Sequence, residues 1–352
     1  MKKVLSITTL AILLLLISGC KASKKDLRNI LKKINETTFD QQALSISFTQ
    51  EYILESHSED DIEKMDYSIE YIGSGTLSII MDETDMDITG YETLLDYNMG
   101  YINCLQNEKY NYIYSDLDKI SNEEKKEVVT SESINDFKLK YDKDKCYVSS
   151  SIEHIDKNDN TKNVKNKFAG KIDRNLLNDT NNSDNLDRLQ AKIVTMDGNY
   201  LNGLVESYAE SMFIDSAKLS DKELNKIIKN NKISAKKNKN TTVINFSINT
   251  SDVINYFYGT TISSKNNVKG TIELDNKTNK LVSFKYDLNK LLYDLFKTDD
   301  PMKITVKNYI VNGMVIDSNV IDMPIEGDFI EYNDSALFIS DIETKAIPNY
   351  EN

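Results

Sequence analysis

The chain has 352 residues, of which 56 are Asp or Glu and 43 are Lys or Arg, so its formal net charge is −13 at pH 7. An acidic chain is repelled by nucleic-acid phosphates and by anionic lipid headgroups, which argues against nucleic-acid partners. Apolar patterning continues almost from end to end without a Pro-rich or Gly/Ser-rich linker. We therefore expect one domain over residues 24–330, followed by an acidic C-terminal tail over residues 331–352.

Residues 1–19 have the three zones of an export signal. Lys2 and Lys3 precede an apolar run from Thr8 to Ile17, and small residues then lead to a cysteine. The run is too short to be a comfortable permanent membrane span, so we expect it to be cleaved. The residues around the cleavage point are Ile17, Ser18, Gly19 and Cys20. This segment resembles the lipobox of bacterial lipoproteins.

The lipobox resemblance implies that a diacylglycerol is attached to the sulfur of Cys20 and that the signal is removed just before this residue. Each buried acyl methylene contributes about 0.8 kcal/mol, so two or three chains such as palmitate hold a protein firmly at a membrane. Residues 20–23 are then the lipidated N-terminus and tether, on the extracytoplasmic face of the cell membrane. The alternative is an ordinary secretory signal with a chance cysteine.

An amphipathic helix is expected directly after the tether. Ser23 can cap this helix together with Asp26, three residues further on. The apolar side chains that follow at helical spacing are Leu27, Ile30, Leu31 and Ile34.

Alternating apolar and polar residues then predict strands over residues 44–54, 67–71 and 77–81. Gly73 and Gly75 lie between two of these strands, and we expect this pair to mark a bulge or tight bend.

The middle of the chain predicts hairpins and then helices. Turns are expected over Gln106–Lys109 and Asp142–Lys145, which favours a mainly antiparallel sheet. Residues 157–185 are rich in Asn, Asp and Lys, a composition typical of an exposed loop. Apolar residues at helical spacing follow over residues 186–196 and 201–212.

Ser220 and Glu223 form a capping-box pattern that predicts the next helix. Strands are expected over residues 244–248 and 282–288, with a short helix over 252–258 between them.

The dipeptide Asn312–Gly313 lies between two apolar segments and predicts a tight hairpin, because both residues tolerate positive φ. The predicted fold class is therefore α+β, with an N-terminal helix, a mainly antiparallel sheet and a helical insertion packed on it.

Two segments are similar to those of the LolA and LppX/LprG group of envelope lipid carriers. Ser47–Gln50 resembles the Phe-Thr-Gln segment that follows the first helix in LolA-type chains, and Gly73–Leu77 resembles the glycine-flanked strand that comes next. Gly270–Leu288 is similar to the late hairpin of related Gram-positive lipoproteins. The resemblance implies a strongly curved antiparallel sheet, a half-barrel, that wraps around covering helices. This chain is much longer than LolA, and it lacks the proline that follows the glycine-flanked strand there.

A half-barrel covered by helices leaves an apolar cleft that can shelter an acyl chain. The expected cleft residues are Phe48, Tyr52, Leu77 and Phe284. The alternative is that these side chains pack as solid core.

Cys104 and Cys146 both lie in an extracytoplasmic chain, where disulfides persist. A bridge between them and two separate buried thiols both remain open, because spacing alone does not place their Cβ atoms within bonding reach.

No catalytic or cofactor motif is found, and no metal site is predicted. His57 and His154 lie in polar stretches and are expected at the surface. Asp156, Asn158 and Asn160 begin like a calcium loop, but the glycine and the glutamate of that pattern are missing.

Two functions follow from these observations. The first is a noncatalytic, membrane-anchored lipoprotein that binds a lipid or another apolar ligand in a cleft between sheet and helices. The second is an interaction or structural lipoprotein of the envelope, with a filled core and a protein partner.

Overall fold

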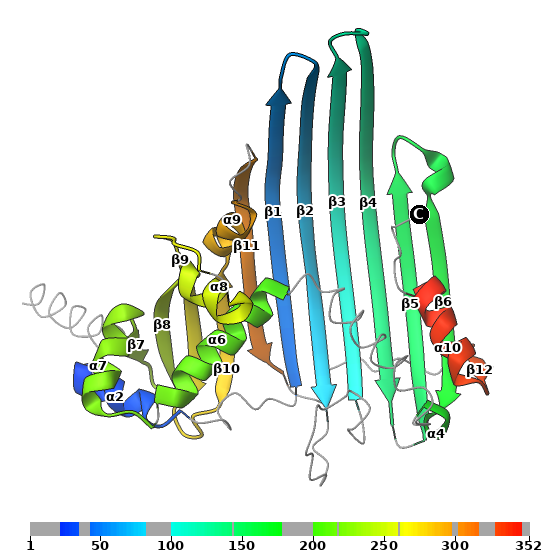
Figure 1. Cartoon of the computed structure of the whole chain (residues 1–352). Helices are drawn as coiled ribbons and strands as arrows, with labels where there is room; N and C mark the ends of the chain where they lie inside the picture. Colours follow the sequence, from blue (N-terminus) through cyan, green and yellow to red (C-terminus); the bar gives the residue numbers. More distant parts are fainter. Residues whose placement is uncertain are drawn as a thin grey trace, which may run out of the picture. The chain divides into compact units, whose positions relative to one another are not determined.

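The computed structural model describes residues 22–34, 43–81, 100–142, 144–177, 200–216, 218–259, 261–297, 302–316 and 328–346. These residues form an α+β protein with a twelve-stranded, mostly antiparallel sheet and seven α-helices (Figure 1). None of the helices in these ranges is long and apolar enough to cross a membrane. The predicted signal, the lipobox with Cys20, and the helix expected over residues 186–196 lie outside the described residues.

The chain divides into two compact units, and each is built from two separated stretches. The small unit comprises residues 1–41 and 204–287, and the large unit comprises residues 42–203 and 288–352. From the sequence we expected one domain over residues 24–330. Because the chain leaves the small unit and later returns to it, no single linker marks the division in the sequence.

The small unit contains four antiparallel strands and four helices. Its strands, in the spatial order β10-β9-β8-β7, are Leu281–Asp287, Asn267–Asp275, Thr241–Asn249 and Ser234–Lys237. Its helices are α2 (Lys24–Leu31), α6 (Tyr200–Ser216, within this unit from Leu204), α7 (Asp221–Asn230) and α8 (Thr250–Tyr258).

Local signals account for the ends of these helices. Ser23 and Ser220 each form the predicted capping box, so the expected starts of α2 and α7 are confirmed. Gly259 ends α8 in the left-handed conformation with φ of 60°. The Nζ of Lys32, the C-cap residue of α2, lies 2.5 Å from a carboxylate oxygen of Asp221 in α7, which joins the two helices.

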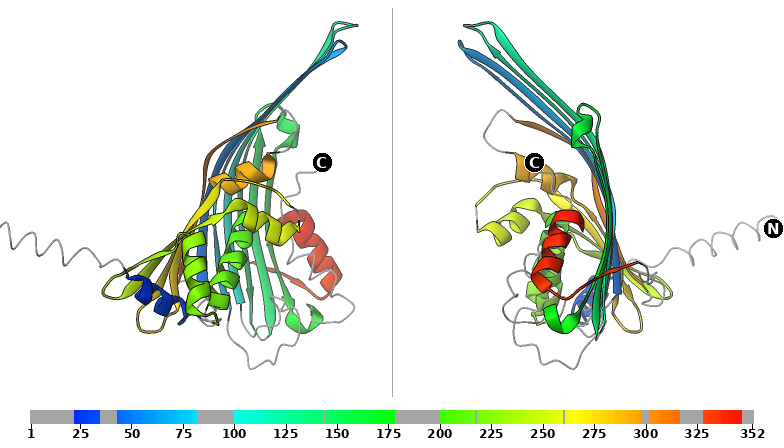
Figure 2. Two further views of the ribbon diagram at one scale, coloured as in Figure 1. Left: turned by 60° about the vertical axis from the view of Figure 1, so that its left-hand side comes forward. Right: turned by 90° about the vertical axis from the view of Figure 1, so that its right-hand side faces the viewer.

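The large unit is a sheet with its described helices on one face (Figure 2). In the spatial order β12-β6-β5-β4-β3-β2-β1-β11, its strands are Ile330–Tyr332, Val164–Asp173, Lys145–Asp156, Glu123–Tyr141, Gly100–Asp118, Glu63–Met81, Ala43–Glu59 and Lys303–Val315. Only β12 and β6 are parallel among these described pairs. The helical segments are η1 (Asn160–Lys162), α4 (Arg174–Leu177), α9 (Asn289–Phe296), α10 (Ser335–Asp341) and η3 (Ile342–Ala346).

The core of the large unit lies where α4, α10 and η3 cover one end of the sheet. Phe137, Val148 and Ile172 from the strands are fully buried together with Phe338 of α10 and Ile342 of η3. The prediction of an acidic tail over residues 331–352 is therefore wrong as far as residue 346. The tail was predicted from the acidic composition of this segment. Its apolar side chains nevertheless recur at helical spacing, and they supply one layer of the core.

The predicted strong curvature is also wrong, because the sheet is neither closed nor strongly curled. The pairs β1–β2 and β2–β3 continue in register through Gly73 and Gly75, without the expected bulge. Closing the sheet into a half-barrel would need bulges, and the pairings from β1 to β4 have none.

Long-range pairing also overrides two predicted turns. Asn312–Gly313 lies inside β11, where it pairs with Ser47 and Ile46 of β1, and Gln106–Lys109 lies inside β3. The turn at Asp142–Lys145 is confirmed between β4 and β5.

The expected loop over residues 157–185 is wrong for residues 164–173. These residues form β6, and Phe168 and Ile172 of this strand belong to the core.

Cys104 and Cys146 are both buried, and neither belongs to a disulfide. They lie on β3 and β5, which both pair with β4, so a strand separates them. Two strand spacings amount to roughly 10 Å, beyond the Cα separation that a disulfide spans. Burial raises the pKa of the Cys146 thiol to about 12, which keeps it protonated at neutral pH.

A pair of neighbouring substitutions in α10 tests its place in the core. Phe338 is fully buried, whereas the adjacent Leu337 is 56% exposed. Phe338→Ala should lower the free energy of unfolding by about 3–5 kcal/mol, because it removes a large core side chain and leaves a cavity. Leu337→Ala should change it by less than about 0.5 kcal/mol. Urea denaturation measures both, and equal effects would contradict this packing.

Candidate functional site

The face of the large sheet that carries the core continues beyond it. Side chains alternate between the two faces of a strand, so the pairing register determines which residues of neighbouring strands share this face. Beyond the apolar core comes a belt of buried polar side chains. These are Gln106, Ser131, Ser133, Asn135, Ser150 and Asp156.

Strands β1 to β4 extend past the described helices of this unit as two long hairpins (Figures 1 and 2). On the same face as the core, this projecting part carries half-buried tyrosines, which we call the tyrosine face. They are Tyr52, Tyr67, Tyr71, Tyr110, Tyr112 and Tyr114. Along β3 the ring of Tyr112 stacks between those of Tyr110 and Tyr114, with centroids 6.4 Å and 6.5 Å away.

The opposite face of these strands carries cross-strand ion pairs. Glu132 lies 3.2 Å from Lys109 and 2.6 Å from Lys157, and Lys307 lies 2.9 Å from Glu51. Such pairs on exposed strands are typical of a solvent-facing surface. The two faces of the hairpins therefore have different chemistry, and aromatic rings are concentrated on one of them.

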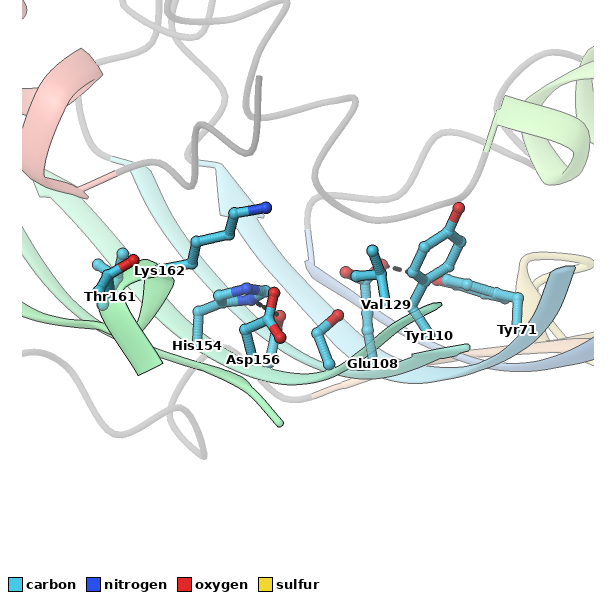
Figure 3. Close-up of a pocket in the computed structure, with 11 residues that line it drawn as sticks. Tyr71, Glu108, Tyr110, Val129, His154, Asp156, Thr161 and Lys162 are labelled. Atoms are coloured by element: carbon cyan, nitrogen blue, oxygen red, sulfur yellow. Dashed lines mark hydrogen bonds between the residues drawn. The ribbon is translucent and has the colours of Figure 1, made fainter. Parts of the chain in front are cut away.

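A pocket of about 630 Å³ opens where the polar belt meets the tyrosine face (Figure 3). Its walls come from β2 to β6 and from the loop that contains η1. The lining residues are Tyr71, Glu108, Tyr110, Val129, Ser131, Ser133, His154, Asp156, Thr161, Lys162 and Val164. The pocket thus combines aromatic rings, hydroxyl groups and charged side chains.

One end of the pocket is organised around Glu108. The hydroxyl of Tyr71 donates to its Oε1 at 2.6 Å, and the Nε2 of Gln106 donates to the same oxygen at 2.7 Å. Burial and the nearby Glu108 carboxylate raise the pKa of Tyr71, so this hydroxyl remains a donor.

Gly73 makes this contact possible. It pairs with Glu108 across the strands, and the Tyr71 ring leans over it along β2. A Cβ at this position would lie 2.5 Å from the Tyr71 hydroxyl oxygen. The glycine is therefore explained by the close approach of a ring and not by a bend.

The other end of the pocket carries His154, Asp156 and Lys162 (Figure 3). The His154 Nδ1 lies 2.8 Å from the Ser133 hydroxyl, and the side chain is half-buried where a solvated surface residue was expected. Residue His57 is a surface residue, as expected, with 57% of its side chain exposed.

The loop that resembles the start of a calcium site uses its oxygens locally. Asp156 Oδ1 accepts from the amides of Asn158 at 2.8 Å and Asp159 at 2.9 Å. Within the ranges that the structure describes, no three His, Cys, Asp or Glu side chains are placed to hold a metal ion.

The four residues expected to line a cleft lie in different surroundings. Phe48 and Leu77 are buried in the large unit, and Phe284 is buried in the small unit. Tyr52 stacks on Tyr71, with ring centroids 5.2 Å apart, and so lies directly behind a pocket residue. The alternative of packed core describes Phe48 and Leu77, since Leu77 belongs to the core cluster and the Phe48 ring covers Gly75.

Sequence reasoning missed Glu108 and Tyr110. The alternation of tyrosines at positions 110, 112 and 114 was visible, and it indicated one aromatic face of a strand. The carboxylate lies on the same face as these rings, two residues before Tyr110. The partners of this strand were not visible, so neither was the pocket.

A tyrosine pair tests the contact at Glu108. Tyr71→Phe should lower the free energy of unfolding by about 1–2 kcal/mol, because it removes a hydrogen bond to a charged group. Tyr112→Phe is the matched control on the same face and should change it by less than about 0.5 kcal/mol. If urea denaturation showed no difference between the two variants, the Tyr71 to Glu108 contact would be refuted.

The small unit contains a second group of titratable residues, on α6. Burial, and next the charge of Glu210 one turn further on, raise the pKa of Glu206 to about 7. The same carboxylates add to the effect of burial in raising the pKa of Tyr286 on β10.

This shift predicts how stability depends on pH. The pKa of Glu206 is about 7 in the folded chain against a usual 4.5, so ionisation disfavours folding as pH rises from 4.5. The full cost, roughly 3 kcal/mol, is present above pH 7. Glu206→Gln should therefore stabilise the protein at pH 8 and not at pH 4. The exposed Glu123→Gln serves as the control in thermal unfolding, and a pH-independent effect of Glu206→Gln would count against the shift.

Comparison with known proteins adds no family to this description. No family model, no curated protein and no solved structure matches the chain.

Proposed function

We propose that the protein is a membrane-anchored, extracytoplasmic lipoprotein that binds a ligand, without catalysis, in the pocket at the base of the tyrosine face. The observation that carries this proposal is the pocket itself, about 630 Å³ in volume and lined by rings, hydroxyl groups and carboxylates. This volume lies within the usual range for small-molecule sites, which combine apolar walls with a few placed polar groups.

The anchor is part of the same proposal and rests on the lipobox resemblance. A diacylglycerol on Cys20 keeps the binding unit at the outer face of the membrane. Lys24, where α2 begins, follows Cys20 by only a few residues. In the proposed protein, only a few residues therefore separate the lipid anchor from the first helix of the small unit.

The lining favours a ligand with an apolar part beside a polar group. Val129 and Val164 contribute aliphatic surface, whereas Glu108 and Asp156 contribute carboxylates. The resemblance to envelope lipid carriers implies an apolar ligand or lipid, and this pocket accommodates such a ligand only together with a polar group. The proposed binding site is therefore the pocket, and not the buried residues Phe48 and Leu77 that were expected to line a cleft.

A protein partner is the second candidate function, and the projecting hairpins favour it. Tyrosine is enriched at protein interfaces, and the tyrosine face is wider than the pocket. At the two hairpin tips Ile62 is 59% exposed and Ile120 is 77% exposed. The backbone amide of Lys119 donates to the Ile62 carbonyl at 2.8 Å, so the two tips lie side by side.

Native mass spectrometry of the mature lipoprotein, followed by solvent extraction, tests the first function. We expect a stoichiometric small-molecule adduct that is lost in Tyr110→Ala, because this substitution removes one wall of the pocket. Tyr114→Ala, on the same strand but outside the pocket, should retain the adduct. An unliganded mass that persists after lipids and polar metabolites are added would reject the pocket and favour a protein partner.

The same preparation tests the anchor. Cys20→Ser should release the protein from the membrane fraction and remove the mass of the acyl chains. A variant that stayed membrane-bound at an unchanged mass would contradict lipidation at this residue.

A further inference from the structure

We propose that the tyrosine end of the pocket binds an organic ammonium group, as found on choline-like molecules and their lipid headgroups. This inference rests on the proposed binding function and names the chemical class of the ligand. It follows from one carboxylate, two rings and the charges around them.

Among the residues that the structure describes, the Glu108 carboxylate has no cationic partner. No ion pair within 4 Å joins it to a Lys, Arg or His side chain in the ranges described above. Its hydrogen bonds there come from Tyr71 and Gln106, which are both neutral, and both go to Oε1. A half-buried carboxylate that lacks a counter-charge favours a cation from outside the chain.

The rings beside this carboxylate suit an organic cation better than a metal ion. Tyr71 and Tyr110 are cross-strand neighbours on the face of the sheet that lines the pocket, next to Glu108 (Figure 3). Aromatic faces attract ammonium groups through the quadrupole of the ring, and cages of such rings recognise choline and methylated lysine. A metal ion would require more oxygen ligands than one carboxylate supplies.

The Tyr71 ring is held in place before a ligand arrives. It stacks on Tyr52, donates to Glu108, and leans over Gly73, where a larger residue would displace it. The Tyr52 ring also packs on Phe296 of α9, with centroids 5.9 Å apart. A preorganised ring loses little conformational entropy on binding, so the ion–ring contact contributes to affinity.

The charge of Lys162 at the far end of the pocket orients the ligand. Lys162 lies at that end and, within the described residues, forms no ion pair with an acidic side chain. Asp156 at this end already accepts hydrogen bonds from the amides of Asn158 and Asp159, so Lys162 disfavours an ammonium group there, whereas Glu108 attracts it at the other end. A ligand that also carries an anionic group, such as a phosphocholine, therefore fits with that group toward Lys162.

Calorimetric titration of the mature lipoprotein in a maltoside detergent tests the proposal with choline and its uncharged isostere 3,3-dimethylbutan-1-ol. We expect choline to bind at least about tenfold more tightly than the isostere, because only choline carries the charge. Glu108→Gln should weaken choline binding by about tenfold or more. Glu132→Gln removes a carboxylate from the opposite face and should leave binding unchanged.

Two further variants separate the contributions to binding. Tyr110→Phe should keep the affinity, because the ring remains, whereas Tyr110→Leu should lose it. Phosphocholine, titrated into Lys162→Ala, measures the far end and should bind more weakly there than to the unchanged chain. Flotation with phosphatidylcholine vesicles, using the Cys20→Ser chain, distinguishes a lipid headgroup from a free amine as the source.

Equal affinity for choline and its isostere, or undiminished choline binding in Glu108→Gln, would overturn the ammonium proposal. Failure of choline, tetramethylammonium and phosphocholine to bind would also overturn it. In each case, an adduct in native mass spectrometry that depends on Tyr110 would still support the proposed binding function. If native mass spectrometry showed no such adduct, the binding function itself would be rejected. The two failures are therefore distinguishable.

Discussion

The uninterrupted pairing of the four strands β1 to β4 is the constraint on which the large unit depends. Each strand has 17 to 19 residues, and the register runs from the buried core to the hairpin tips without a shift between them. Because side chains alternate strictly, one face carries first the core, then the polar belt, then the tyrosines. A slip of one residue would move every one of these groups to the other face.

Glycine and tyrosine maintain this register together. Gly75 lies under the ring of Phe48 and Gly73 lies under the ring of Tyr71, so aromatic side chains cover backbone that would otherwise be bare. Coverage of a strand glycine by an aromatic ring is a known way to stabilise sheets. In this chain it also turns Tyr71 toward Glu108. The packing that stabilises the strand therefore builds one end of the pocket.

Features that depend on neighbouring residues were predictable from the sequence. The capping boxes at Ser23 and Ser220 each depend on interactions within a few residues, and both are confirmed. Strands were located by alternation. The failures occurred where a distant strand decides the outcome, since Asn312–Gly313 and Gly73 both carry turn signals but pair with long neighbouring strands.

The candidate site could be predicted only in part. Alternation indicated which side chains share a face of a strand, but it did not indicate which stretch of that face a helix covers. The pattern therefore selected Phe48 and Leu77, which pack inside, and not Glu108 or His154, which line the pocket. These two residues lie on strands β3 and β5, and only the complete strand order brings them together.

Cross-linking on both sides of the glycines tests the register directly. Thr76 pairs with Leu105 on one side of Gly73, and Ser68 pairs with Ile113 on the other. With the native Cys104 and Cys146 replaced by alanine, Thr76→Cys with Leu105→Cys and Ser68→Cys with Ile113→Cys should each form a disulfide on mild oxidation. Suppose that positions 76 and 105 cross-linked, but that position 68 cross-linked only to a residue next to 113. A bulge would then lie at the glycines. That result would contradict the shared face of Tyr71, Tyr110 and the pocket.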